Sequence, residues 1–198
     1  GTEFEAFGGN NPDHQTILPF TRWMGGPMDY TPGIFQTKLD YYFPGDKRFV
    51  KTTLAKQLGL YVVMYQPLQM AADLPENYAK HMDAFQFIKD VAADWDDTKI
   101  LSAEPGDYIH TARKAKGTDN WFVGGITDEN AREYTVDFSF LDKGKKYEAI
   151  IYKDGKDADY INNPQSYSIE KKLVTSDSKV KIQLARSGGY AISVKPVK

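Results

Sequence analysis

The residues of this 198-residue sequence best suited to chemistry are carboxylates in short extended segments near its start. Glu3 lies in the first such segment, residues 2–7, and Glu5 shares its face because side chains two apart on a strand point the same way. Asp29 falls in the second, residues 27–30. A carboxylic acid that donates a proton, paired with a carboxylate that acts as base or nucleophile, is the machinery of glycoside hydrolysis. Spacing alone favours a surface glutamate beside a strand end, and only the surrounding motif favours the catalytic interpretation.

The pieces around these carboxylates alternate between extended and helical character. Residues 2–7 end at a glycine- and asparagine-rich breaker, and a short helix is expected over Asp13–Met24. Pro19 either kinks that helix or marks its start. This alternation predicts two consecutive units of a (β/α)8 barrel, in which the strand ends carry the chemistry. The long loop of residues 34–50 would then emerge on the active-site face.

Helical periodicity continues after that loop. A helix capped by Thr52 or Thr53 is expected to run to about Tyr65. A capping-box pattern at residues 73–76 opens a further helix. Both helices belong to the barrel part of the prediction.

Near Asp94 the period of the apolar residues changes to two. Turn signals separate the alternating runs at short, regular spacing, which predicts an antiparallel β-sandwich. We therefore expect an α/β plus all-β chain, with the last βα units of a barrel over residues 1–95 and a C-terminal sandwich over residues 96–198. The clearest alternating runs are Tyr134–Phe140, Val180–Leu184 and Tyr190–Val194.

Five motifs distributed along the chain carry a resemblance to a known family. They are GTEF at residues 1–4, NPDHQTILPFTR at 11–22, GPMDYTPG at 26–33, TTLAKQL with YQPLQMA at 52–71, and EPGD at 104–107. Together they resemble glycoside hydrolase family 97, the calcium-dependent α-glucosidases and α-galactosidases. The resemblance covers the whole chain and corresponds to the C-terminal portion of such an enzyme.

The resemblance assigns roles to individual residues. Glu3 falls on the family's general acid and is also a possible calcium ligand, while the other ligands and the second carboxylate lie outside this chain. One residue cannot hold calcium, which prefers six to eight oxygens. Asp29 is predicted either to face the substrate or to be a turn residue. His14 is predicted either to contact the substrate or to form a hydrogen bond within its own loop.

The implied activity is that of an exo-acting α-glycosidase, retaining or inverting, that releases terminal α-linked glucose or galactose from oligosaccharides. The resemblance also implies calcium as cofactor, the remainder of the parent barrel as partner, and export, for example to the periplasm. Residues 1–198 alone are expected to be inactive, since two of eight units cannot close a barrel. The alternative is a non-catalytic C-terminal module that binds carbohydrate or protein.

Composition excludes several other classes. The hydrophobic share of 41%, the charged share of 26% and the net charge of −2 give no reason to expect nucleic acid or an anionic membrane as partner. The absence of cysteine excludes disulfides, thiolate metal sites and a cysteine nucleophile. No apolar run approaches the length that a bilayer crossing needs.

Overall fold

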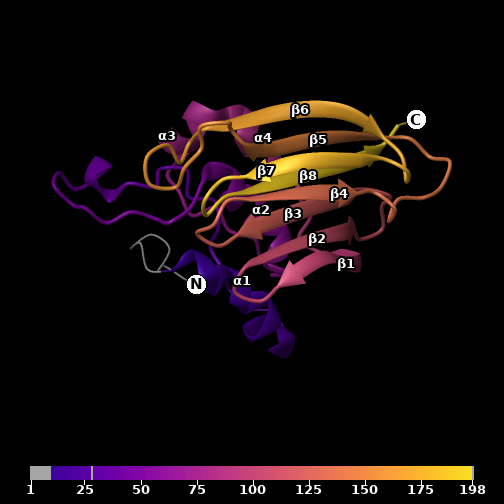
Figure 1. Ribbon diagram of the computed structural model, residues 1–198, viewed down its shortest axis with the longest axis horizontal. Helices are drawn as coiled ribbons and strands as arrows, with labels where there is room; N and C mark the ends of the chain where they lie inside the picture. Colours follow the sequence, from indigo (N-terminus) through magenta and orange to yellow (C-terminus); the bar gives the residue numbers. More distant parts are fainter. Residues whose placement is uncertain (1–9, 28, 198) are drawn as a thin grey trace.

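The computed structural model describes residues 10–27 and 29–197, in which helices come first and strands follow (Figure 1). The helices are α1 (Pro12–Ile17), α2 (Leu54–Val63), α3 (Pro75–Tyr78) and α4 (Met82–Asp90), with 3-10 turns at Leu18–Phe20, Arg22–Gly25, Leu39–Tyr41 and Ala79–His81. The strands are β1 (Trp95–Glu104), β2 (Tyr108–Ala115), β3 (Trp121–Thr127), β4 (Arg132–Asp137), β5 (Tyr147–Asp154), β6 (Tyr167–Val174), β7 (Lys179–Leu184) and β8 (Gly189–Pro196). Each described helix falls short of the length and apolar character that a bilayer crossing requires.

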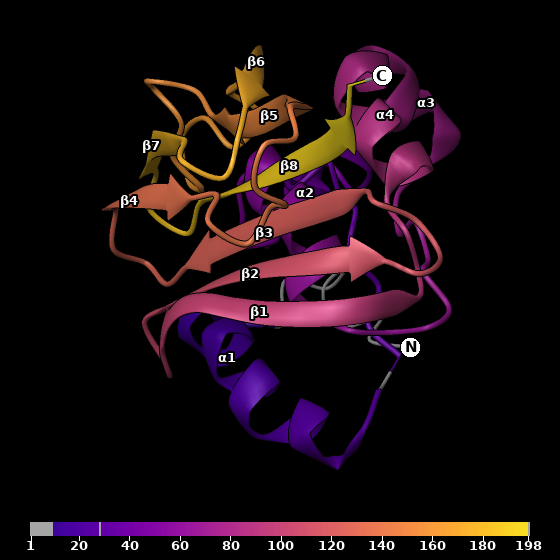
Figure 2. The same cartoon turned by 90° about the vertical axis from the view of Figure 1, so that its right-hand side faces the viewer.

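The strands form two antiparallel sheets. One has the order β1-β2-β3-β8-β5-β6, and the other pairs β4 with β7. Figure 2 shows β4 and β7 on one side of the large sheet and helices α3 and α4 on the other. The predicted antiparallel sheet is therefore confirmed, and the helical segment covers its second face.

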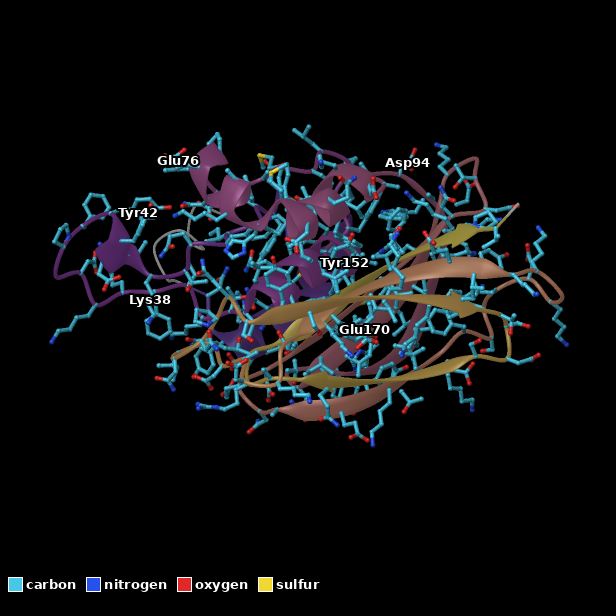
Figure 3. All side chains as sticks on the ribbon, turned by 90° about the horizontal axis from the view of Figure 1, so that it is seen from above. Lys38, Tyr42, Glu76, Asp94, Tyr152 and Glu170 are labelled. Atoms are coloured by element: carbon cyan, nitrogen blue, oxygen red, sulfur yellow. The ribbon has the colours of Figure 1, made fainter. Side chains whose placement is uncertain are left out.

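Covering both faces of the large sheet changes the burial pattern of its central strands. Every residue of β3 is buried, whereas β7 alternates strictly between exposed and buried. β8 was predicted from alternation, yet its first six residues are all buried because odd and even positions enter different cores. On the β5–β6 pair, Tyr152 points toward the helices and Glu170 toward the small sheet (Figure 3).

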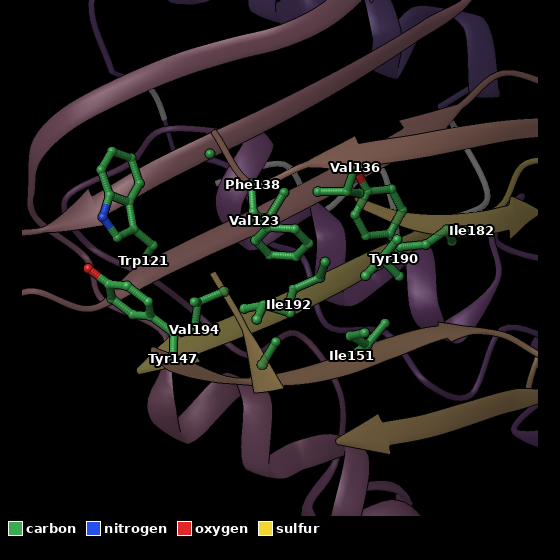
Figure 4. Packing of buried hydrophobic residues seen from close by; sticks show 14 of the residues in the cluster. Trp121, Val123, Val136, Phe138, Tyr147, Ile151, Ile182, Tyr190, Ile192 and Val194 are labelled. Carbon is green, nitrogen blue, oxygen red and sulfur yellow. The ribbon is translucent and has the colours of Figure 1, made fainter. Parts of the chain in front are cut away.

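The core between the two sheets is built from aliphatic and aromatic side chains of both (Figure 4). Val123, Ile151 and Ile192 from the large sheet meet Val136 and Ile182 from the small one. Burying such side chains contributes about 1.5–3 kcal/mol each. β4 and β7 have this core on one face and solvent on the other, so their residues alternate between apolar and polar with a period of two.

Helix α2 forms the layer on the other face of the large sheet. Thr53 is its N-cap, and the Thr53 side chain accepts a hydrogen bond from the Lys56 N–H at 3.2 Å, which decides between the two predicted caps. All ten residues of α2 are buried. A Cβ built on Gly124 of β3 would lie 2.6 Å from the Gly59 carbonyl oxygen of α2, so the two backbones are in direct contact.

The other two helical predictions are corrected in detail. The helix expected over Asp13–Met24 ends at Ile17 and continues as two 3-10 turns, because Pro19 cannot donate to the helical ladder. The capping box at residues 73–76 is not formed: Leu74 is the N-cap of α3 and makes no side-chain cap bond.

The predicted βα units are not seen in the described residues before Trp95, which contain no named strand. Residues 30–36 form no strand, and several of their N–H groups go to side chains. Tyr30 donates to Gln66, Gly33 and Ile34 donate to Gln57, and Phe35 and Gln36 donate to Asp73. A barrel strand requires a paired strand on each side, and these side chains occupy that place.

The predicted division at residues 95 and 96 coincides with the change from helices to strands. Packing nevertheless runs across it, since α2 shares one core with Phe122 of β3, Tyr152 of β5 and Ala191 of β8. The division into residues 1–95 and 96–198 thus stays a prediction.

The glycine contact yields a stability test. In the intact protein, Gly124→Ala should lower the free energy of unfolding by at least about 2 kcal/mol, because overpacking a tight contact costs about 1–3 kcal/mol and backbone atoms cannot rotate away. Thermal unfolding measures the loss. Gly25→Ala is the matched control, since a Cβ there meets nothing within 4 Å. Equal unfolding temperatures for the two variants would contradict the close approach of α2.

Candidate functional site

Glu3, the predicted general acid, and its neighbour Glu5 lie outside the described residues. The other two candidates are described. His14 is exposed on α1, and its Nδ1 lies 3.3 Å from Asn10 Oδ1. Asp29 is exposed directly before the buried Tyr30. The bond to Asn10 is local, as expected if His14 orders its own loop, and the roles of Glu3, Asp29 and His14 stay predictions.

Tyr30 joins the segments that carry His14 and Asp29. The Gln15 amide of α1 donates to the Tyr30 hydroxyl at 3.0 Å, and the Tyr30 N–H donates to Gln66 Oε1 at 2.6 Å. The Trp23 ring meets the Tyr30 ring edge-on at 5.9 Å, and its indole N–H donates to the Tyr65 carbonyl. A fully buried tyrosine therefore connects the segments that carry the two candidates.

Gln57 and Asp73 hold the segment that follows Tyr30. Gln57 Oε1 accepts the N–H groups of Gly33 and Ile34 at 2.8 and 3.1 Å. Asp73 Oδ2 accepts those of Phe35 and Gln36, both at 2.7 Å. These long-range roles were missed in the sequence, where Asp73 fitted a local cap, because no spacing rule links residues 23 to 38 positions apart.

Asp154 is the buried acid whose ionisation is most altered. Its Oδ2 accepts the N–H groups of Ala185 and Gly189 at 2.8 and 2.9 Å. Burial raises the pKa of Asp154 to about 6, opposed by the Thr53 hydroxyl, these two N–H groups and Lys56. Strongly shifted acids mark functional sites or structural networks. Here the bonds join the end of β5 to the turn before β8, which is a structural role.

Lys56 places a second charge in the interior. It is fully buried on α2, and its ammonium donates to the Thr127 carbonyl at 2.9 Å and to the Ser187 hydroxyl at 3.1 Å. Burying an ammonium is costly unless it is hydrogen-bonded. Lys56 therefore ties α2 to the ends of β3 and the β7–β8 turn.

The described residues do not by themselves fit a calcium ion. Within residues 10–27 and 29–197, no group of three or more His, Asp or Glu side chains is placed to hold a metal. Because calcium needs six to eight oxygens, we derive no chemical step through a metal from these residues.

Comparison with known proteins identifies the class of molecule. The family model described as "Glycosyl-hydrolase 97 C-terminal, oligomerisation" matches residues 94–195. A retaining α-galactosidase of Bacteroides thetaiotaomicron is 39% identical over 184 residues, which are 92% of this chain and 27% of that enzyme. The chain is thus similar to the C-terminal part of glycoside hydrolases.

Solved structures agree with this class. Two family 97 enzyme structures from Pseudoalteromonas sp. strain K8, one with acarbose and one of a glutamate-to-glutamine variant with panose, superpose on this chain with a TM-score of 0.92. Their identities are 48% and 47%, covering 100% of this chain and 31% of theirs. The chain belongs to glycoside hydrolase family 97 and lies in its C-terminal region. The resemblance seen in the motifs is confirmed, and the chain spans about 30% of the length of these relatives.

Removing the acceptor that holds residues 33 and 34 should destabilise the site surface. Gln57→Leu leaves two buried N–H groups without a partner, at about 1–3 kcal/mol each. We expect a clear drop in the thermal midpoint of the intact protein. Gln36→Leu is the control, because that amide donates to the exposed Lys38 carbonyl at 3.3 Å and its loss should change little. Matching midpoints would show that Gln57 does not hold this segment.

The raised pKa of Asp154 predicts the sign of a pH effect. The folded state keeps the proton up to about pH 6, whereas the unfolded carboxyl releases it near 3.8, so this group's contribution to stability is greatest below pH 4 and is lost as the pH rises through 6. The loss is on the order of 3 kcal/mol at about 1.4 kcal/mol per pKa unit.

Asp154→Asn should remove this dependence. Plotting the difference in thermal midpoint between the wild type and Asp154→Asn from pH 4 to 7 measures it, and exposed Glu148, changed to Gln, is the control. A difference that does not vary with pH would contradict the assignment.

Proposed function

We propose that this chain is the C-terminal part of an exo-acting α-glycosidase that releases a terminal α-linked hexose from oligosaccharides. The observation that carries the proposal is the 39% identity to a retaining α-galactosidase over 92% of the chain. The 48% identity to a family 97 enzyme solved with acarbose supports an oligosaccharide substrate. Family resemblance favours glucose or galactose as the sugar, and the name of the α-galactosidase supports a retaining course.

Glu3 is proposed as the general acid that protonates the glycosidic oxygen. Its support is the GTEF motif within the run of family motifs. General acid catalysis contributes about 10²–10⁴-fold to the rate. Asp29 and His14 are proposed as substrate-side residues carried by the surface that Tyr30 anchors.

The test uses two substrates that differ in leaving group. In the intact protein, Glu3→Gln should slow hydrolysis of panose by about 10²–10⁴-fold. It should slow hydrolysis of a nitrophenyl α-hexoside far less, because a nitrophenolate leaves without a proton. Glu5→Gln, two residues away, should leave both rates close to wild type. Equal losses on both substrates, or full activity of Glu3→Gln on panose, would contradict the general-acid role.

The isolated chain is proposed to be inactive, with the remainder of the parent barrel as its partner. Large apolar side chains stand exposed in the helical part, with Met24 at 81%, Phe43 at 64% and Leu68 at 67%. We propose that the remainder of the barrel covers them. Turnover of an aryl α-hexoside by residues 1–198 alone would oppose this.

Calcium dependence and export rest on the family resemblance. Glu3 is proposed to contribute one calcium ligand, with the other ligands outside this chain. Chelation by EGTA should abolish turnover in the intact enzyme and added calcium should restore it, while unchanged turnover would remove calcium from the proposal. Cell fractionation tests the exported location.

A second candidate function is association between copies through the sheets. The family model that matches residues 94–195 carries oligomerisation in its description. Among the described residues, β1 and β6 are the end strands of the large sheet, and Leu173 on β6 is 70% exposed. Unpaired edges of this kind can accept a strand from another chain. Light scattering on the intact protein decides it, and a monomer at micromolar concentration would oppose this function.

A further inference from the structure

An open groove of about 820 Å3 lies between the β5–β6 hairpin and β7. Glu170 of β6 faces this side of the hairpin, toward the small sheet, as Figure 3 shows. His14 and Asp29 do not line it. Side chains from β5, β6, β7 and the β7–β8 turn form its walls, including Lys153, Ser168, Glu170, Lys181, Gln183 and Arg186.

The groove contains as many basic as acidic side chains, and several are paired within it. Lys153 Nζ lies 2.5 Å from Glu170 Oε1, and Arg186 Nη1 lies 3.4 Å from Asp159 Oδ2. A charged ligand therefore finds no excess of opposite charge. The four basic residues are Lys153, Lys156, Lys181 and Arg186, and the four acidic ones are Asp154, Asp157, Asp159 and Glu170.

The floor of the groove is held in place by buried hydrogen bonds. Asp154 accepts the N–H groups of Ala185 and Gly189, which fixes the end of β5 against the β7–β8 turn. The hairpin connection is closed by the Ser166 hydroxyl, which donates to Asp157 at 2.5 Å, and by the pairing of Asp159 with Asn163. A site formed in advance loses less entropy when it binds.

These features together select a neutral ligand that both donates and accepts hydrogen bonds. Hydroxyl groups do both, and they can bond ammonium, guanidinium, carboxylate and amide groups alike. The volume lies in the range of about 300–1,000 Å3 that is typical of ligand sites. We propose that this groove binds a neutral α-linked oligosaccharide. The choice of sugar rests on the proposed function, whereas the groove and its charge balance do not.

The experiment uses the intact protein and the sulfur-linked analogue of panose, which is neutral and resists hydrolysis. Calorimetry compares the wild type with Glu170→Gln and with Glu148→Gln, a matched change on β5 that lies outside the groove. Glu170→Gln should weaken one binding event by at least about 10-fold, whereas Glu148→Gln should not. Hydrolysis of a nitrophenyl α-hexoside should be the same in all three.

Two results of these measurements would overturn the proposal. An isotherm of Glu170→Gln identical to wild type overturns the proposal. The proposal is also overturned if light scattering shows that Glu170→Gln differs from the wild type in oligomeric state, since the groove would then be an interface between copies. If Glu170→Gln unfolds early, Gln183→Ala takes its place. If the wild type hydrolyses no glycoside, the proposed function fails, while selective loss of binding in Glu170→Gln still supports the groove.

Discussion

The backbone contact between α2 and the large sheet is the constraint on which the rest of this structure depends. Gly59 on the helix and Gly124 on β3 bring main chain against main chain, and a Cβ on Gly189 would lie 2.8 Å from the Lys56 Cα. The sheet covers one face of α2, and Phe35, Tyr78 and Phe87 also pack in its core, so all ten residues of α2 are buried. Its polar residues must then find partners inside the protein, and each one links α2 to another segment.

The hydrogen bonds of Lys56 and Gln57 connect α2 to two different parts of the fold. Lys56 reaches the end of β3 and the β7–β8 turn, near the carboxylate of Asp154, so charge is buried only where hydrogen bonds compensate it. Gln57 accepts the N–H groups of Gly33 and Ile34 in the segment that begins at Tyr30. The candidate site surface and the groove beside β6 are thus both supported from one helix, although they lie in different parts of the fold.

The candidate site residues could be predicted only from the family motifs. Those motifs identified the family, which the comparisons confirm, and placed Glu3, His14 and Asp29 as candidates whose roles are still predictions. They did not indicate that residues 30–36 would be held by amide and carboxylate side chains instead of barrel strands. Such bonds join positions 23 to 38 residues apart, where neither periodicity nor cap signals apply.

By itself the sequence determined the elements whose pattern is local: a threonine cap for α2 at Thr52 or Thr53, an interruption at Pro19, and the alternation of β4 and β7, which each have one face in water. Only the tertiary structure decided that β3 and β8 are central, that α2 lies on the second face of the sheet, and that Asp73 serves a distant loop. The physical reason is that periodicity records which faces of an element are wet. A strand or helix that is buried on all sides shows no such periodicity in its sequence. Packing between distant segments determines which elements lie beside it.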